Sequence, residues 1–320
     1  MYKFKEGSVV VFYGDSITNH GAWVRRVYDY YLNTAKIKCE MYNLGVSGNS
    51  SERAYARIDK VLELDPTDVV VMFGMNDVSY SSFNKGGFTD EDVKTIREHR
   101  DRNFVCYKKI IEELSAKGIN IVFCTPTICD ELSDGEERNP LGVNGAIKEL
   151  SDRMFELSKS YGGNVIDFNT AFFEAHKRAF KEGGSLIGRD RVHPNAAGYD
   201  FMANYFLYSQ GFDVKYESSY SELVKGSEKP YSEWEVKRYE LEEKAKICDY
   251  ARYDYFWNIK GEDELIAAVK KAIETHEASS WAKGDTLTYV ENCFKEFLSE
   301  RENANKYYEE YVAYTKTATK

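Results

Sequence analysis

The chain has 320 residues, which is enough for one large domain or two smaller ones. Hydrophobic residues make up 42% of it and charged residues 30%, so a chain that is disordered, collagen-like or coiled-coil throughout is excluded. The 53 acidic and 43 basic residues give a net charge of −10, which argues against a nucleic-acid partner and against charge-driven binding to an anionic membrane.

Strand and helix patterns alternate over the first two-thirds of the chain. Apolar runs predict strands at 8–13, 37–44, 68–73, 119–124 and 165–168, and helical spacing predicts helices at 23–32, 52–64, 100–116, 144–161 and 196–208. Unbroken apolar strands that alternate with helices are typical of a parallel sheet covered by helices on both faces. Because ligands of such sheets bind at the carboxyl ends of the strands, we expect the functional residues at the strand exits.

Two segments depart from this alternation. The polar stretch 80–92, after the third strand, predicts a loop that either covers the site or lies elsewhere on the surface. After residue 212 the strand patterns end, and three amphipathic, aromatic-rich stretches predict helices. We therefore expect a main domain over residues 1–212 and a helical extension over 213–320, packed on the main domain or at the interface of a homo-oligomer.

The sequence carries no membrane or secretion signal that we recognise. No apolar run approaches the ~20 residues that span a bilayer, and the first residues lack the apolar core of a signal peptide. The six cysteines form no CxxC pair and no metal-ligand spacing, which predicts reduced thiols. We therefore expect a cytoplasmic protein without a membrane partner.

The first two strand exits carry a serine and a pair of glycines. Ser16 stands two residues after Gly14, where a turn exposes its hydroxyl and the N–H groups of the following helix can face an anion. A serine in this position also commonly does no more than cap a helix. At the second exit, Gly45 and Gly48 allow the backbone to approach a ligand and leave N–H groups free, although an ordinary turn has the same composition.

Amide, carboxylate and imidazole side chains follow later in the chain. Asn76, after the third strand, offers a neutral donor to a developing oxyanion, unless it only closes a turn. Asp190 precedes His193 by three residues, a spacing that lets the carboxylate accept the Nδ1 proton while Nε2 faces outward. His20, close to Ser16, is an alternative base.

Together these segments supply the parts of an acyl-transfer site, namely a nucleophile, a base with its orienting carboxylate, and oxyanion donors. The Gly-x-Ser-x-Gly pattern of α/β-hydrolases is absent, as are the glycine patterns of phosphate-binding and dinucleotide-binding loops. In order and spacing, the segments around Ser16, Gly48 and Asn76 and the segment Asp190–His193 resemble the four sequence blocks of the SGNH (GDSL-type) serine esterases, over about residues 8–210.

The resemblance implies a flavodoxin-like three-layer α/β/α fold with a parallel sheet. It also implies that Ser16 is the nucleophile, that His193 is the base and that Asp190 orients it. The oxyanion hole would comprise the Ser16 N–H, the Gly48 N–H and the Asn76 side chain. One oxyanion-hole assignment stays open, and one residue differs from the family's motif. Gly45 is an alternative to Gly48, and Ile17 stands where the family's name motif has leucine, a conservative change.

We therefore expect a serine hydrolase that cleaves O-acyl esters through an acyl-enzyme and needs no metal or organic cofactor. Polar and aromatic residues at 80–84 favour a small acyl group such as acetyl and a carbohydrate as the alcohol. The alternatives are a lysophospholipase or thioesterase on the same site, and a non-catalytic ligand-binding or interaction protein. A metal-dependent deacetylase would use Asp15, His20, Asp190 and His193 instead.

Overall fold

The computed structural model describes residues 2–84, 89–133, 141–246, 267 and 306–319. By their contacts the residues divide into two compact units, one of Met1–Glu235 with Ala318–Lys320 and one of Val236–Thr317. Most of the helical extension that the sequence predicts after residue 212 falls outside the described residues, so it stays a prediction. Within the described residues, no helix is long and apolar enough to cross a membrane.

The first unit contains a five-stranded, all-parallel sheet in the order β2-β1-β3-β4-β5. Its strands are β1 (Val9–Gly14), β2 (Glu40–Asn43), β3 (Asp68–Met72), β4 (Asn120–Cys124) and β5 (Val165–Ile166). The helices of this unit are α1 (Ser16–Asn19), α2 (Ala22–Asp29), α3 (Ser51–Tyr55), α4 (Ile58–Leu62), α5 (Asp90–Ala116), α6 (Val143–Ser158), α7 (Phe168–Lys181), α8 (Ala196–Ser209) and α9 (Tyr220–Ser227). Helix α10 (Glu233–Lys246) begins with the last residues of this unit, and most of its residues belong to the second.

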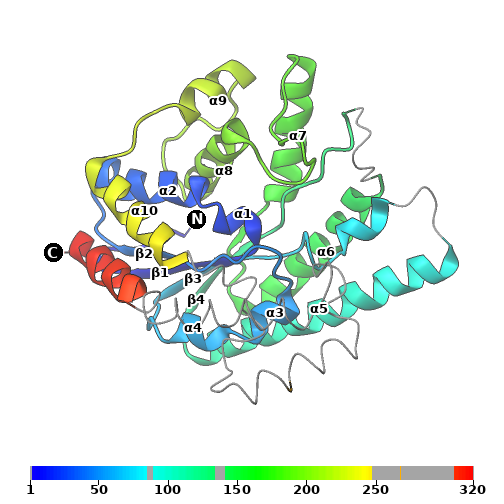
Figure 1. Cartoon of the computed structure of the whole chain (residues 1–320), viewed down its shortest axis with the longest axis horizontal. Helices are drawn as coiled ribbons and strands as arrows, with labels where there is room; N and C mark the ends of the chain where they lie inside the picture. Colours follow the sequence, from blue (N-terminus) through cyan, green and yellow to red (C-terminus); the bar gives the residue numbers. More distant parts are fainter. Residues whose placement is uncertain (1, 85–88, 134–140, 247–266, 268–305, 320) are drawn as a thin grey trace. The chain divides into compact units, whose positions relative to one another are not determined.

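Helices cover both faces of this sheet. Helices α2, α7 and α8 lie on one face, and α3, α4, α5 and α6 lie on the other (Figure 1). Every residue of β3 is buried, which explains why its apolar run is unbroken rather than alternating. The predicted α/β fold with a helix-covered parallel sheet is confirmed.

Three of the differences between the structure and the predicted elements have a local cause. The helix predicted over 52–64 is interrupted at Arg57, whose backbone leaves the helical region so that its guanidinium can turn toward the strand exits. Helix α5 begins ten residues earlier than predicted, inside the predicted loop 80–92, because Thr89 and Asp92 form a capping box. Helix α7, which the sequence pattern did not reveal, begins after an Asp167 N-cap.

In the second unit, α10 and the helix at 306–315 share a buried polar cluster. Arg238 forms an ion pair with Glu242, and its guanidinium donates to the Tyr311 hydroxyl over 3.1 Å. All three side chains are almost completely buried. The hydroxyl and the carboxylate therefore compensate the buried arginine charge.

Asp77, just after β3, ties the third strand exit to α3. Its carboxylate accepts hydrogen bonds from the Ser51 N–H over 2.6 Å and from the Ser51 hydroxyl over 2.7 Å. Burial raises the pKa of the Asp77 carboxyl to about 6, against the opposing effect of these two hydrogen bonds. Folding therefore takes up a proton at this residue at mildly acidic pH.

We predict that Asp77→Asn flattens the dependence of stability on pH. In the wild type, a pKa raised from 3.8 to about 6 makes the fold lose roughly 3 kcal/mol from this group as pH rises between about 4 and 7. An asparagine can keep both bonds to Ser51 without the charge. Urea unfolding across this pH range measures the difference between the two proteins, and parallel pH profiles would contradict the prediction.

Two glycines provide a second prediction. A Cβ on Gly198, near the start of α8, would lie 2.1 Å from the Leu186 carbonyl oxygen, whereas a Cβ on Gly145 in α6 would meet nothing within 4 Å. Gly198→Ala should therefore destabilise the protein by about 1–3 kcal/mol or more. Gly145→Ala, the matched control, should stabilise it by about 0.5–1 kcal/mol, because alanine favours a helix. Thermal or urea unfolding of both variants tests this, and equal effects would contradict it.

Candidate active site

Ser16 is the first residue of α1, directly after β1. Asp15 caps this helix by accepting a hydrogen bond from the Ile17 N–H over 3.0 Å. Gly14 is needed at the strand end because a Cβ there would lie 2.2 Å from the Thr18 hydroxyl. Burial raises the pKa of the Asp15 carboxyl to about 7, against the opposing bond from Ile17. The tight turn and its cap therefore fix the position of the serine.

The structure brings Ser16, His193 and Asp190 together. The Ser16 hydroxyl lies 2.7 Å from His193 Nε2, and the Asp190 carboxylate is hydrogen-bonded to His193 Nδ1. Asp190 also accepts the backbone N–H groups of Val192 over 3.1 Å and of His193 over 3.0 Å. Because the carboxylate accepts a hydrogen bond from Nδ1–H, Nε2 is left as the acceptor for the serine hydroxyl.

The Asp190 carboxyl stays ionised in this arrangement. Burial alone would raise its pKa, but the bonds from the His193 ring and from two backbone N–H groups hold the pKa below its usual value. The carboxylate is therefore charged at neutral pH where it faces the His193 ring.

His20, the alternative base, lies beside His193. Their rings meet edge to face with 5.2 Å between centroids. Both line a shallow depression at the serine, whose residues are His20, Gly188, Arg189, Asp190, His193, Pro194 and Tyr199. The surface next to the nucleophile is thus formed by rings, a glycine and charged or polar side chains.

The two candidate glycines differ in their surroundings. Gly45 is enclosed, since its N–H donates to the Asn43 side chain over 2.9 Å and a Cβ would lie 2.3 Å from the Asn19 nitrogen. Gly48 has a φ of +77°, and a Cβ there would meet nothing within 4 Å. Among the described residues, no hydrogen bond of the Gly48 N–H is found. Of the two glycines, Gly48 therefore has the more open surroundings and an N–H that is available to an oxyanion.

The Asn76 side chain is oriented by a hydrogen bond to the loop that follows β2. Its amide nitrogen donates to the Asn49 carbonyl over 2.9 Å, which accounts for one of its two N–H bonds. The Asn76 carbonyl is bonded in turn to His99 Nε2 over 3.2 Å. Asn76 is therefore held at both its side chain and its backbone.

Arg57 and His99 are residues of the site region that sequence reasoning missed. The Arg57 guanidinium donates to the Leu44 carbonyl over 3.0 Å and to the Asn49 side chain over 2.7 Å, and it lies over the Tyr13 ring. It therefore links the exits of β1 and β2. Arg57 lies in the predicted helix 52–64 and His99 directly precedes the predicted helix 100–116, where nothing in the spacing distinguishes them from surface residues.

Phe83, in the segment 80–84 that favoured a small substrate, is buried rather than exposed. Its ring lies next to Gly142, where a Cβ would meet it at 3.6 Å. Tyr80–Asn84 form a short 3-10 helix. The Phe83 ring thus contributes to the core and not to a binding surface.

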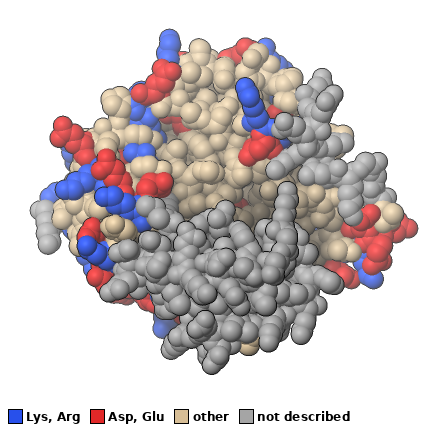
Figure 2. Space-filling view, viewed as in Figure 1, with Lys and Arg blue, Asp and Glu red and all other residues tan. Residues whose placement is uncertain are grey.

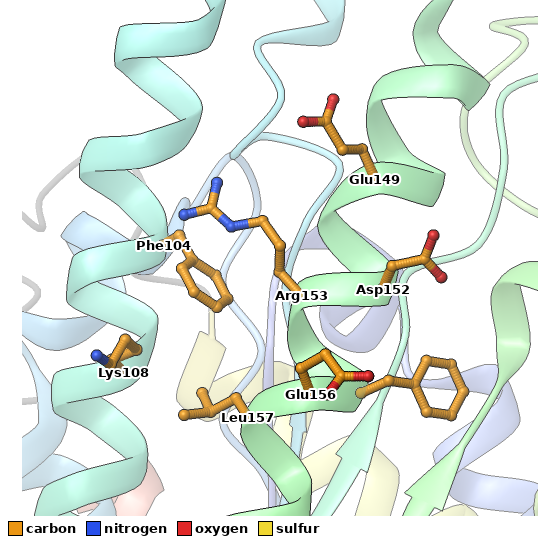
Figure 3. Close-up of a pocket in the computed structure, with 8 residues that line it drawn as sticks. Phe104, Lys108, Glu149, Asp152, Arg153, Glu156 and Leu157 are labelled. Atoms are coloured by element: carbon orange, nitrogen blue, oxygen red, sulfur yellow. The ribbon is translucent and has the colours of Figure 1, made fainter.

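A second surface groove, between α5 and α6, contains none of the predicted site residues (Figure 3). Arg153 lies 4.1 Å from the centroid of the Phe104 ring and forms an ion pair with Asp101 over 2.5 Å. On the described part of the face in Figure 2, acidic and basic side chains are interspersed around a central region of other residues. Neither feature indicates a charged ligand.

The carboxylates and histidines of the site are engaged with one another or with backbone. Asp15 accepts from Ile17, and Asp190 bonds to His193. In the part of the chain that the structure describes, no three His, Cys, Asp or Glu side chains are grouped as a set of metal ligands.

Solved structures share this fold. A gut microbial diltiazem-metabolizing enzyme matches with a TM-score of 0.72 and 18% identity, over 100% of this chain and 97% of that one. Axe2, an acetylxylan esterase from Geobacillus stearothermophilus, matches with a TM-score of 0.53 and 22% identity, over 67% of this chain and 99% of its own. Two Axe2 variants are described as catalytic mutants, one at an aspartate and one at a histidine three positions later.

Sequence comparison agrees with the structural one. The acetylxylan esterase of Geobacillus stearothermophilus is 23% identical over 231 residues, which are 66% of this chain and 97% of that protein. The sequence profile of the GDSL-like lipase/acylhydrolase family matches residues 12–201, from β1 into α8. The chain belongs to the GDSL-like lipase/acylhydrolase family and is a carboxylic ester hydrolase.

Proposed function

We propose that this hydrolase works through a triad of Ser16, His193 and Asp190. The observation that carries the proposal is the 2.7 Å contact between the serine hydroxyl and His193 Nε2, with Asp190 bonded to the other ring nitrogen. A serine hydroxyl is a weak nucleophile until an adjacent base accepts its proton. The catalytic aspartate and histidine mutants of Axe2, three positions apart, support the assignment of Asp190 and His193.

The reaction follows from these positions. Ser16 Oγ attacks the ester carbonyl while His193 Nε2 takes the hydroxyl proton, and the tetrahedral intermediate carries its negative charge on the former carbonyl oxygen. The N–H groups of Ser16 and Gly48 and the second N–H of Asn76 stabilise that oxygen. His193 then protonates the departing alcohol. Water attacks the acyl-enzyme while His193 accepts its proton, and the acid is released as His193 returns that proton to Ser16 Oγ.

We further propose that the substrate is an ester of a small acyl group, with an acetylated carbohydrate as the leading candidate. The relatives support acetyl esters, since Axe2 is described as an acetylxylan esterase. The shallow depression beside Ser16, lined by polar and ring side chains, supports a hydrophilic alcohol more than a long apolar chain.

Ser16→Ala should abolish nearly all turnover, by at least about 10⁴-fold, because no other group replaces the nucleophile. Hydrolysis of a chromogenic acetate ester measures this, with circular dichroism as the control for folding. Ester hydrolysis that persists in a folded Ser16→Ala protein would disprove the serine mechanism.

Asn76→Ala should lower kcat by roughly 10²–10³-fold and leave KM nearly unchanged, because its free N–H acts mainly on the transition state. Steady-state kinetics on the same ester separate the two constants. A rise in KM at constant kcat would instead place Asn76 in substrate binding.

The acyl group is tested with a series of esters that share one alcohol and differ in chain length. We expect kcat/KM to be highest for acetyl and to fall as the chain lengthens, because the site offers no long apolar surface among its described lining residues. A steady rise toward long chains would favour the lysophospholipase alternative, and a preference for acetyl thioesters over oxygen esters would favour the thioesterase.

A further inference from the structure

Arg191 lies in the sequence between Asp190 and His193 of the proposed triad, and its backbone conformation is unusual. Its φ is +64°, in the left-handed region that costs energy for any residue with a Cβ. Its side chain is not free on the surface, because only 8% of the residue is exposed. A glycine would adopt this backbone without strain, so the arginine side chain requires an explanation of its own.

The guanidinium is bonded to the segment that follows β4. Arg191 Nε donates to the Asp130 carbonyl over 3.0 Å, and Nη2 donates to the Ser133 carbonyl over 2.7 Å. In return, the Asp130 N–H donates to the Arg191 carbonyl over 2.9 Å. Among the described residues, Arg191 thus joins the loop of Asp190 and His193 to the segment after β4 by three hydrogen bonds.

The Asp130 carboxylate stabilises the conformation of the segment after β4 to which the guanidinium is bonded. It accepts the N–H groups of Leu132 over 2.9 Å and of Ser133 over 3.1 Å, and it is bonded to His176 Nε2 over 3.1 Å. His176 Nδ1 accepts the Leu186 N–H, so His176 Nε2 carries the proton and donates to Asp130. Although burial alone would raise it, these bonds keep the pKa of the Asp130 carboxyl well below its usual value.

The segment after β4 also contacts the loop that carries Asn76. A Cβ on Gly74 would lie 2.4 Å from the Pro126 ring, so the proline packs directly on that backbone. The Cys129 sulfur lies 3.5 Å from the Met75 sulfur, and both side chains are buried. The same short segment therefore contacts the proposed oxyanion donor's loop on one side and the loop of the proposed base on the other.

We propose that Arg191 is a positioning residue that fixes the Asp190–His193 pair relative to Asn76, through the carbonyls of Asp130 and Ser133. The inference rests on the proposed triad. Attack by the serine and stabilisation of the oxyanion require the base and the donor at a set separation, and a displacement of about 1 Å can cost on the order of 10²-fold in rate. The two-directional fork of a guanidinium can bond to two carbonyls at once, whereas an ammonium is a single point charge.

Arg191→Gly separates this role from mere stability, because glycine removes the guanidinium and also relieves the backbone strain. We expect kcat to fall roughly 10²-fold with KM within threefold of the wild type, in a protein that is folded by circular dichroism. Arg191→Lys, which keeps the charge and the aliphatic stem, should recover part of kcat. Asp65→Gly is the matched control, since Asp65 is exposed and has a φ of +48°, and its kinetics should equal those of the wild type.

Labelling with a fluorophosphonate separates failure of this inference from failure of the triad. A wild-type protein that is not labelled at Ser16 would overturn the proposed function and this inference with it. A labelled wild type, together with an Arg191→Gly protein whose kcat and labelling rate stay within threefold, would overturn only the role of Arg191. A rise in KM at constant kcat would overturn it as well. If Arg191→Gly does not fold, folded Arg191→Lys takes its place in the test. A kcat of Arg191→Lys within threefold of the wild type would then overturn the role of Arg191, and a larger fall would support it.

Discussion

The hydrogen bond between Ser16 and His193 joins two residues that are 177 positions apart in the sequence. A contact of 2.7 Å between such distant residues forms only if the elements that carry them are fixed to within a fraction of that length. The parallel sheet provides this fixation. It places the exits of β1, β2 and β3 at one edge, and the turn before α8, closed by an antiparallel bridge between Ile187 and Pro194, brings the histidine to the same edge.

Buried and half-buried polar groups connect these exits to one another. Arg57 links the exits of β1 and β2, Asp77 links that of β3 to α3, and Arg191 links the histidine loop to that of β4. Each charge is costly to remove from water, and an apolar core would avoid the cost. Each of them is satisfied by hydrogen bonds with defined directions, which apolar contacts cannot supply. The site therefore depends on directional bonds at the strand ends rather than on packing alone.

The parts of this arrangement that depend on local sequence could be predicted. The valine runs of β1 and β3 are buried on both faces, so their pattern identified strands, and the turns around Ser16 and Asp190 carry side chains whose chemistry is evident from spacing. What depends on tertiary contact could not be predicted. The interruption at Arg57, the burial of Phe83 and the bonds of Arg191 follow from where other segments lie, and a single sequence without structure holds no sign of them.

The central claim is that Ser16 is activated by His193, and covalent labelling tests it most directly. Wild-type protein treated with a fluorophosphonate should gain one adduct, which peptide mapping locates at Ser16, and His193→Ala should slow its formation by several orders of magnitude. An unlabelled wild type, an adduct at another residue, or labelling as fast in His193→Ala as in the wild type would contradict the account.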